Sequence, residues 1–197
     1  MFGRFWHRDL QRGQQLLELT VAVLRKHNQN DLDTVPALLK ALDTAIESFA
    51  AANDLPKASQ LESLKAELIT SERGINPYTF EKVHIGRNAL NKIVAFKILQ
   101  SLEAILRQHL NEITLQLKEG GNLLQHLVLL AVQNASLSAE QIEQADSPEA
   151  VESIWEDLGK DATLGVAQKK ILLTVGFHDA ILLLDQILII LRGRAGV

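Results

Sequence analysis

Hydrophobic residues recur at intervals of three and four along almost the whole chain, and no stretch shows a convincing alternation of period two. The first pattern is typical of amphipathic α-helices, whereas the second would indicate strands. The sequence therefore predicts an all-α protein, a multi-helix bundle that forms one domain over residues 1–197. The alternative is a sub-boundary at residues 73–77, where arginine, glycine and proline interrupt the pattern.

Polar breaks and prolines divide the first part of the chain into three helices. The first is predicted from Phe5 to His27, where a polar stretch follows. The second begins near Thr34, because Asp33 or Thr34 can accept hydrogen bonds from free amides of the first turn. The third runs from Pro56 to Ser71, since proline is well tolerated in the first turn of a helix.

The next segment, Tyr78 to Lys118, has no proline and a single glycine, Gly86. A straight helix of this length would reach about 60 Å, which exceeds the usual width of a domain of this size. We therefore expect a break near Gly86, or a projecting part that pairs with another subunit. The adjacent glycines 120 and 121 are predicted to end this segment, and a short apolar helix from Leu123 to Asn134 follows.

Three further helix starts are indicated near the C-terminus. The Ser138 to Gln141 pattern predicts a capping box and a brief helix to about Ala145. Ser147 and the proline after it open another helix, which continues through Leu158. The last helix is predicted to begin between Asp161 and Leu164 and to end at Arg192.

The centre of this last helix, Ile171 to Leu191, is apolar on nearly all sides, which is typical of a core helix or of a membrane span. The run has about the 20 residues that a bilayer crossing requires. Asp185 lies near its middle, however, where an aspartate costs roughly 2.5 to 3.5 kcal/mol on insertion scales. We therefore predict a single buried helix around which the bundle is built.

Composition narrows the range of functions. The chain has 0 cysteines, which excludes disulfides, thiol chemistry and cysteine zinc sites. Its formal net charge is −4, so the chain lacks the excess of positive charge that is typical of proteins that bind nucleic acid, and we expect no nucleic-acid partner. The N-terminus lacks the features of a secretory signal, and the expected location is cytoplasmic. Phe2, Phe5 and Trp6, interleaved with arginines, could touch a membrane surface, but an aromatic plug over one end of the bundle is favoured.

The strongest candidate site lies on the last helix. An ionised carboxylate that is buried without a partner is costly, so Asp185 should be buried with a cation or a set of donors. His178 lies two turns earlier on the same face, and Asp179 and Gln186 line the next face. We interpret these four residues as a hydrogen-bonded network that fixes helix register, with a ligand-binding or proton-handling site as the alternative.

A second candidate surrounds His84. His84, Arg87, Asn88, Leu90 and Asn91 resemble the phosphoacceptor box of sensor histidine kinases, although an isoleucine replaces its acidic residue and an alanine its proline. The resemblance implies a phosphoacceptor or anion site at His84, Arg87, Asn88, Asn91 and Lys92. The alternative is an ordinary polar helix surface.

Glu81 and His84 also have the Glu-x-x-His spacing of di-iron bundles. The spacing occurs only once here, so we predict no metal and no cofactor.

No sequence motif identifies a reaction, and no catalytic residue is assigned. We expect a non-catalytic regulatory or adaptor protein, a homodimer that binds an unknown protein partner through a helical face or groove. The first alternative is a bundle that holds a small-molecule or lipid-like ligand near His178, Asp179 and Asp185. The second is a histidine phosphotransfer module that uses His84. A binding module requires an exposed apolar groove, a ligand binder an enclosed pocket, and a phosphotransfer module an accessible His84.

Overall fold

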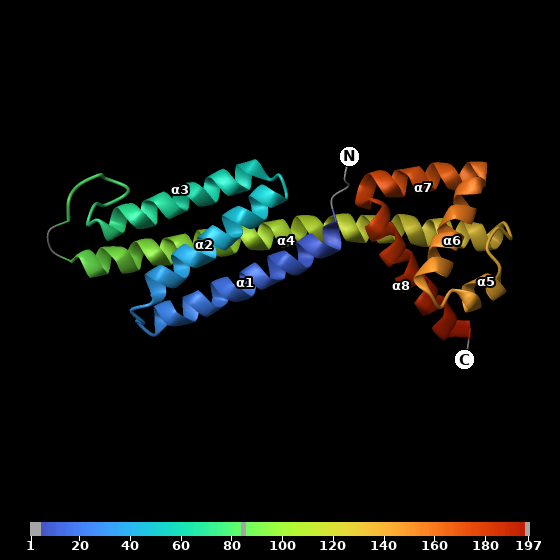
Figure 1. Cartoon of the computed structure of the whole chain (residues 1–197), viewed down its shortest axis with the longest axis horizontal. Helices are drawn as coiled ribbons and strands as arrows, with labels where there is room; N and C mark the ends of the chain where they lie inside the picture. The colour runs from blue at the N-terminus through green and yellow to red at the C-terminus, as the bar shows by residue number, and fades with distance from the viewer. Residues whose placement is uncertain (1–4, 84–85, 196–197) are drawn as a thin grey trace. The chain divides into compact units, whose positions relative to one another are not determined.

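The computed structural model describes residues 5–83 and 86–195, shown in Figure 1. These residues form eight α-helices and no β-strand; the one β-type pairing between described residues is an isolated bridge between Ile75 and Lys82. The all-α bundle predicted from the hydrophobic periodicity is therefore confirmed.

The chain divides into two compact units. The N-terminal unit comprises Asp9–Asn111, and the C-terminal unit comprises Met1–Arg8 together with Glu112–Val197. Helix α4, Arg87–Gln133, contributes residues to both. The 73–77 segment is a turn inside the N-terminal unit and does not separate the two units. That all 197 residues fold as one domain stays a prediction.

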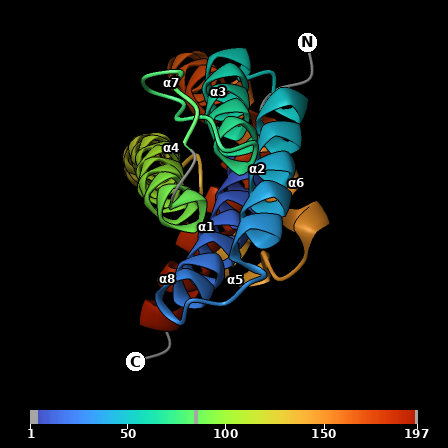
Figure 2. The same cartoon turned by 90° about the vertical axis from the view of Figure 1, so that its left-hand side faces the viewer.

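The N-terminal unit is a four-helix arrangement. Its helices are α1 (Trp6–Asn28, from Asp9 onward), α2 (Thr34–Ala51), α3 (Leu55–Glu72) and the first part of α4. Figure 2 shows these helices grouped side by side. Each helix turns an apolar stripe inward, and the shared core includes Leu16, Val23, Leu38, Leu42, Phe49, Leu61, Leu68, Ile98, Leu102 and Leu106.

The predicted limits of the first three helices lie within one or two residues of the observed ones. Asp54 caps α3, because its carboxylate accepts a hydrogen bond from the Lys57 amide at 3.4 Å. The start of α2 at Thr34 is confirmed, but the capping role predicted for Asp33 or Thr34 is wrong. The Asp33 side chain makes no capping bond, and the Thr34 hydroxyl donates to the Asp31 carbonyl instead.

Helix α4 differs from its prediction at both ends. It begins at Arg87, directly after Gly86, whose φ of 86° suits glycine; the predicted break near Gly86 is confirmed, and the helical prediction for residues 78–83 is wrong. The helix then continues through Gly120 and Gly121 to Gln133, so the predicted stop there is also wrong. Gly120 instead lies where α4 packs closely on α7, because a Cβ on Gly120 would overlap Val175.

The C-terminal unit contains the end of α4 followed by α5 (Ala139–Gln144), α6 (Pro148–Lys160), α7 (Ala162–Val175) and α8 (Phe177–Ala195). The predicted capping box is confirmed, because Ser138 accepts from the Gln141 amide and the Gln141 side chain accepts from the Ser138 amide. The Ser147 side chain caps α6 by accepting a hydrogen bond from the Ala150 amide. Asp161 caps α7 by accepting bonds from the amides of Thr163 and Leu164.

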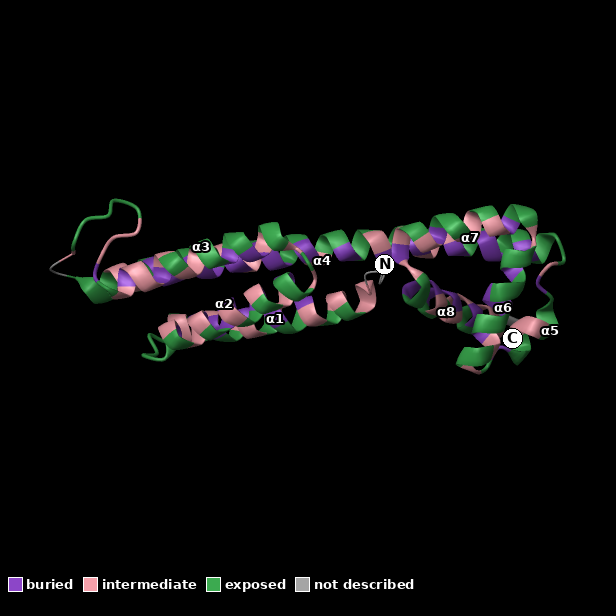
Figure 3. Cartoon of the chain, turned by 45° about the horizontal axis from the view of Figure 1, so that its top comes forward, coloured by how far each residue is buried: buried purple, intermediate pink, exposed green. Residues whose placement is uncertain are grey.

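The single helix predicted from Leu164 to Arg192 is wrong, because Gly176 divides it. Gly176 has a φ of 81°, a conformation that side chains with a Cβ rarely adopt. Helices α7 and α8 consequently meet at an angle of 113°. Each buries only one side, and Figure 3 shows exposed turns along both. Leu173 on α7 is 89% exposed, and Ile190 on α8 is 53% exposed.

No single helix within the described ranges is long and apolar enough to cross a membrane. Helices α7 and α8 meet the requirements of length and composition only when they are taken together across their sharp bend.

Candidate functional site

The C-terminal unit carries an apolar groove between the last turns of α4 and of α8, with a volume of about 500 Å³. We call this feature the α4–α8 groove. Apolar side chains dominate its walls, and two of them, Leu129 and Ile190, are 55% and 53% exposed. The lining residues are Gln125, His126, Val128, Leu129 and Val132 from α4, and Ile187, Ile190 and Leu191 from α8.

Two glycines create this groove. Helix α4 continues as far as Gln133, and Gly120 lets it pack closely against Val175 of α7. Because Gly176 turns the chain, α8 leaves the direction of α7 and brings Ile187 and Ile190 to the wall opposite Leu129. Neither a stop at residues 120–122 nor a straight final helix would place these apolar side chains together.

The described walls of the α4–α8 groove are mostly apolar. Among the described residues that line it, none is an aspartate, glutamate, lysine or arginine, and His126 is the one titratable side chain. A lone histidine among aliphatic neighbours has no second group with which to share a proton transfer. The groove can therefore accept an apolar surface, with Gln125 and His126 available for hydrogen bonds at one end.

The buried carboxylate of the C-terminal unit is Asp179 and not Asp185. The Asp179 side chain is 0% exposed. Its Oδ2 accepts a hydrogen bond from the Trp6 amide at 2.6 Å, and its Oδ1 accepts one from the His7 amide at 3.1 Å. His7 Nδ1 also lies 2.5 Å from Oδ1.

The position of Asp179 is favourable for a negative charge on two counts. It accepts from the first amides of α1, and it also lies in the first turn of α8. Both helix N-termini carry partial positive charge. With its oxygens occupied by these donors, Asp179 anchors the N-terminal residues to α8, which favours the structural interpretation of this carboxylate.

The other residues of the predicted network do not gather around Asp179. Asp185 was expected to be buried, but its side chain is 43% exposed, and its nearest cation is Arg192 at 4.0 Å. His178 and Gln186 are also exposed. The reason is the bend at Gly176. Because α7 and α8 are separate helices, residues before and after the bend do not share the faces of one continuous helix. The His178 ring contacts the rings of Phe5 and Phe177, with centroids 5.7 and 5.8 Å apart.

The predicted phosphoacceptor site is only partly described, because His84 lies outside the described residues. Phe2, which belongs to the predicted membrane contact, also lies outside them. Arg87 and Asn88 are exposed at the start of α4, and the Arg87 guanidinium donates to the Glu72 carbonyl. Lys92 donates to the side chain of Asn30 at 2.8 Å, and Asn91 is half-buried. Arg87 and Lys92 thus both engage groups of the protein itself.

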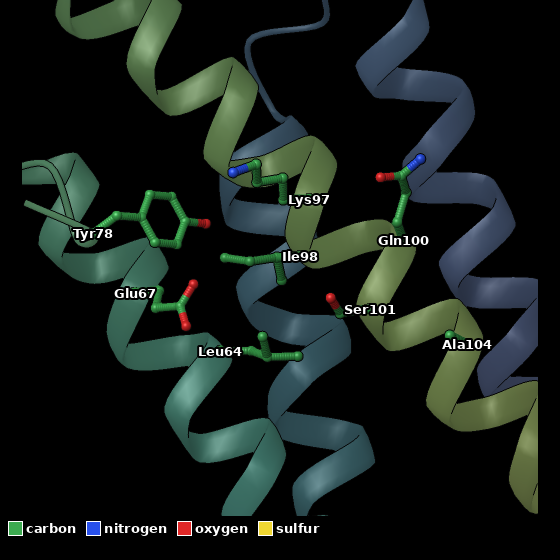
Figure 4. Close-up of a pocket in the computed structure, with 8 residues that line it drawn as sticks. All are labelled: Leu64, Glu67, Tyr78, Lys97, Ile98, Gln100, Ser101 and Ala104. Atoms are coloured by element: carbon green, nitrogen blue, oxygen red, sulfur yellow. The ribbon is translucent and has the colours of Figure 1, made fainter.

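An open pocket of about 480 Å³ lies between α3 and α4 in the N-terminal unit, where Figure 4 shows Tyr78 between Glu67 and Lys97. Burial raises the pKa of the Tyr78 hydroxyl, and the charge of Glu67 and a hydrogen bond to it act in the same direction. Lys97 Nζ lies 4.4 Å from the centre of the Tyr78 ring. The two charged residues therefore both hold Tyr78, which fastens the 73–83 loop onto the bundle.

Metal-binding residues do not cluster within residues 5–83 and 86–195, where no group of three His, Cys, Asp or Glu side chains could hold an ion. Glu81 is exposed in the loop before α4. His109 is only 5% exposed and packs edge-on against Phe49, with ring centroids 4.8 Å apart.

Comparison with known proteins gives no relative. No family model, no curated protein and no solved structure matches the chain.

Sequence reasoning missed the α4–α8 groove and the role of Asp179. The groove had a signal in the sequence, since Leu129, Leu130 and Val132 give α4 more apolar surface than one inward stripe needs. Asp179 had a weaker signal. It follows Gly176 by three residues, and an acidic residue at that distance after a break is typical of the first turn of a new helix.

Proposed function

We propose that the protein is a non-catalytic adaptor that binds a helical segment of a protein partner in the α4–α8 groove. The observation that supports this proposal is the uncharged groove of about 500 Å³, in which Leu129, Val132 and Ile190 are 55%, 45% and 53% exposed. Contiguous exposed apolar side chains framed by polar ones are typical of interaction sites.

The dimensions of the groove favour a short amphipathic helix as its occupant. Its α4 wall extends from Gln125 to Val132, which is about 10 Å along the axis. Two turns of a partner helix would match this length, with apolar anchors at positions i, i+3 or i+4, and i+7. Because none of the described side chains that line the groove is charged, the partner's docking face should also be uncharged, since burying an unpaired charge is costly.

A charge placed in the groove should prevent partner binding. We expect Ile190→Asp or Leu129→Asp to reduce the amount of partner that co-purifies with the tagged full-length protein by at least about tenfold, which corresponds to about 1.4 kcal/mol. Both side chains are more than half exposed, so the fold should tolerate the changes, and circular dichroism should be unchanged. The readout is quantitative mass spectrometry of proteins captured from the native cells.

The matched control is Leu115→Asp, which changes a leucine of α4 that is 65% exposed and does not line the groove. This variant should capture the same partner as the wild type. Equal loss from all three variants, or no loss from the groove variants, would contradict the proposal. The mass of the purified wild type in solution also tests the homodimer, which stays a prediction.

A further inference from the structure

Helix α7 presents a second apolar surface, on the side opposite to its core contacts. Its buried side consists of Leu164, Ile171 and Val175. On its outer side, Val166 and Leu173 are 70% and 89% exposed. These two residues lie about 20° apart around the helix axis, so they form one apolar line. We call this surface the outer face of α7.

Two lysines flank the apolar line on the outer face of α7. At 100° per residue, Lys169 and Lys170 lie about 50° to either side of the midline between Val166 and Leu173. Both lysines are exposed, and neither forms an ion pair with any side chain in the described part of the chain. Helix α7 contains no aspartate or glutamate, so its outer face is locally positive although the whole chain has a net charge of −4.

An apolar centre between two lysines is the pattern of helices that lie in a membrane interface. There the apolar side chains enter the boundary of the acyl chains, while lysine stems extend so that their ammonium groups reach the headgroups. At the C-terminal end of α7, directly after Gly176, Phe177 is 44% exposed. Its ring packs against that of His178, which in turn contacts Phe5, so an aromatic group lies where α7 ends.

We propose that the outer face of α7 binds the surface of an anionic membrane, with Val166 and Leu173 in the interface and Lys169 and Lys170 on anionic headgroups. Charge complementarity favours lipid over an acidic peptide, because an acidic peptide would leave Leu173 uncovered beside the charged contacts. The net charge of −4 repels anionic vesicles, so attraction must come from this local cluster. The proposal does not depend on the α4–α8 groove.

The test is flotation of the full-length protein with phosphatidylcholine vesicles, alone or with about 30% phosphatidylserine. The wild type should bind the phosphatidylserine vesicles at least about tenfold more strongly at low salt, and this preference should weaken as salt screens the lysines. Leu173→Glu should reduce this binding at least about tenfold. The double variant K169Q/K170Q should lose the preference for phosphatidylserine.

Leu115→Glu is the matched control and should bind vesicles as the wild type does, because Leu115 is a 65% exposed leucine of α4 that lies outside the outer face of α7. Ile190→Asp should also retain vesicle binding, which separates this proposal from that of the groove. No binding of the wild type to phosphatidylserine vesicles at low salt would overturn the proposal. So would full binding by Leu173→Glu, or a protein partner that Leu173→Glu loses while vesicles never bind.

Discussion

Replacement of Asp179 by alanine is expected to lower the free energy of unfolding by about 3 kcal/mol, the usual cost of breaking a buried charged contact. The carboxylate is 0% exposed and accepts from the amides of Trp6 and His7. Alanine would leave both amides without their acceptor and His7 without its partner. It would also remove a negative charge from two helix N-termini.

The measurement is thermal and urea unfolding of Asp179→Ala beside Asp185→Ala. A loss of about 3 kcal/mol corresponds to a fall in Tm of roughly 6 to 12 °C for a chain of this length. Asp185→Ala should change stability by less than about 1 kcal/mol, because a partly exposed pair in contact with solvent contributes little and the Arg192 guanidinium is 4.0 Å away. Equal effects of the two substitutions, or a larger effect of Asp185→Ala, would contradict this assignment.

The second large effect is expected at Gly120, where alanine should destabilise the protein by about 2 kcal/mol. In an exposed helix this substitution would stabilise by up to about 1 kcal/mol, because glycine is a poor helix former. At Gly120, however, the new Cβ would overlap Val175. Val175 is 1% exposed, and its branched side chain has little rotational freedom, so it cannot move away cheaply.

Gly121→Ala is the matched control for Gly120→Ala. A Cβ at Gly121 would meet Leu183 at 4.0 Å, which is an ordinary contact, so this variant should be neutral or slightly stabilised in urea unfolding. Combining Gly120→Ala with Val175→Ala should cost less than the sum of the two single changes, because the second removes the atoms that overlap. A stabilised Gly120→Ala variant would show that α4 and α7 do not pack closely at this point.

The helix starts could be read from the sequence wherever a local hydrogen bond decides them. Ser138, Ser147 and Asp161 each accept bonds from amides two or three residues ahead, and these patterns are visible in the sequence alone. Glycine was harder to interpret. Gly176 ends a helix where we expected none to end, and Gly120 lies inside a helix where we expected a stop. A turn with positive φ and a close approach of two helices both favour glycine. Only the tertiary contacts therefore show which role a given glycine has.

The candidate sites were less predictable for the same reason. Winding residues 171–191 as one helix placed Asp185 in the most apolar surroundings, whereas in the bent structure its side chain is 43% exposed and Asp179 is buried. The partner groups of Asp179 are amides at positions 6 and 7, more than 170 residues away in the sequence. The α4–α8 groove likewise requires both glycines in their observed roles.

The most direct test of the adaptor proposal is site-specific photo-cross-linking in the native cells, with a photoreactive amino acid at Val132 in the α4–α8 groove. The proposal predicts one dominant cross-linked protein, mapped to an amphipathic helix of that partner, and the loss of this product when Ile190→Asp is added. The same probe at Leu115 should not give it. A cross-link that persists with Ile190→Asp, or none at Val132 in cells that contain the full-length protein, would contradict the proposal.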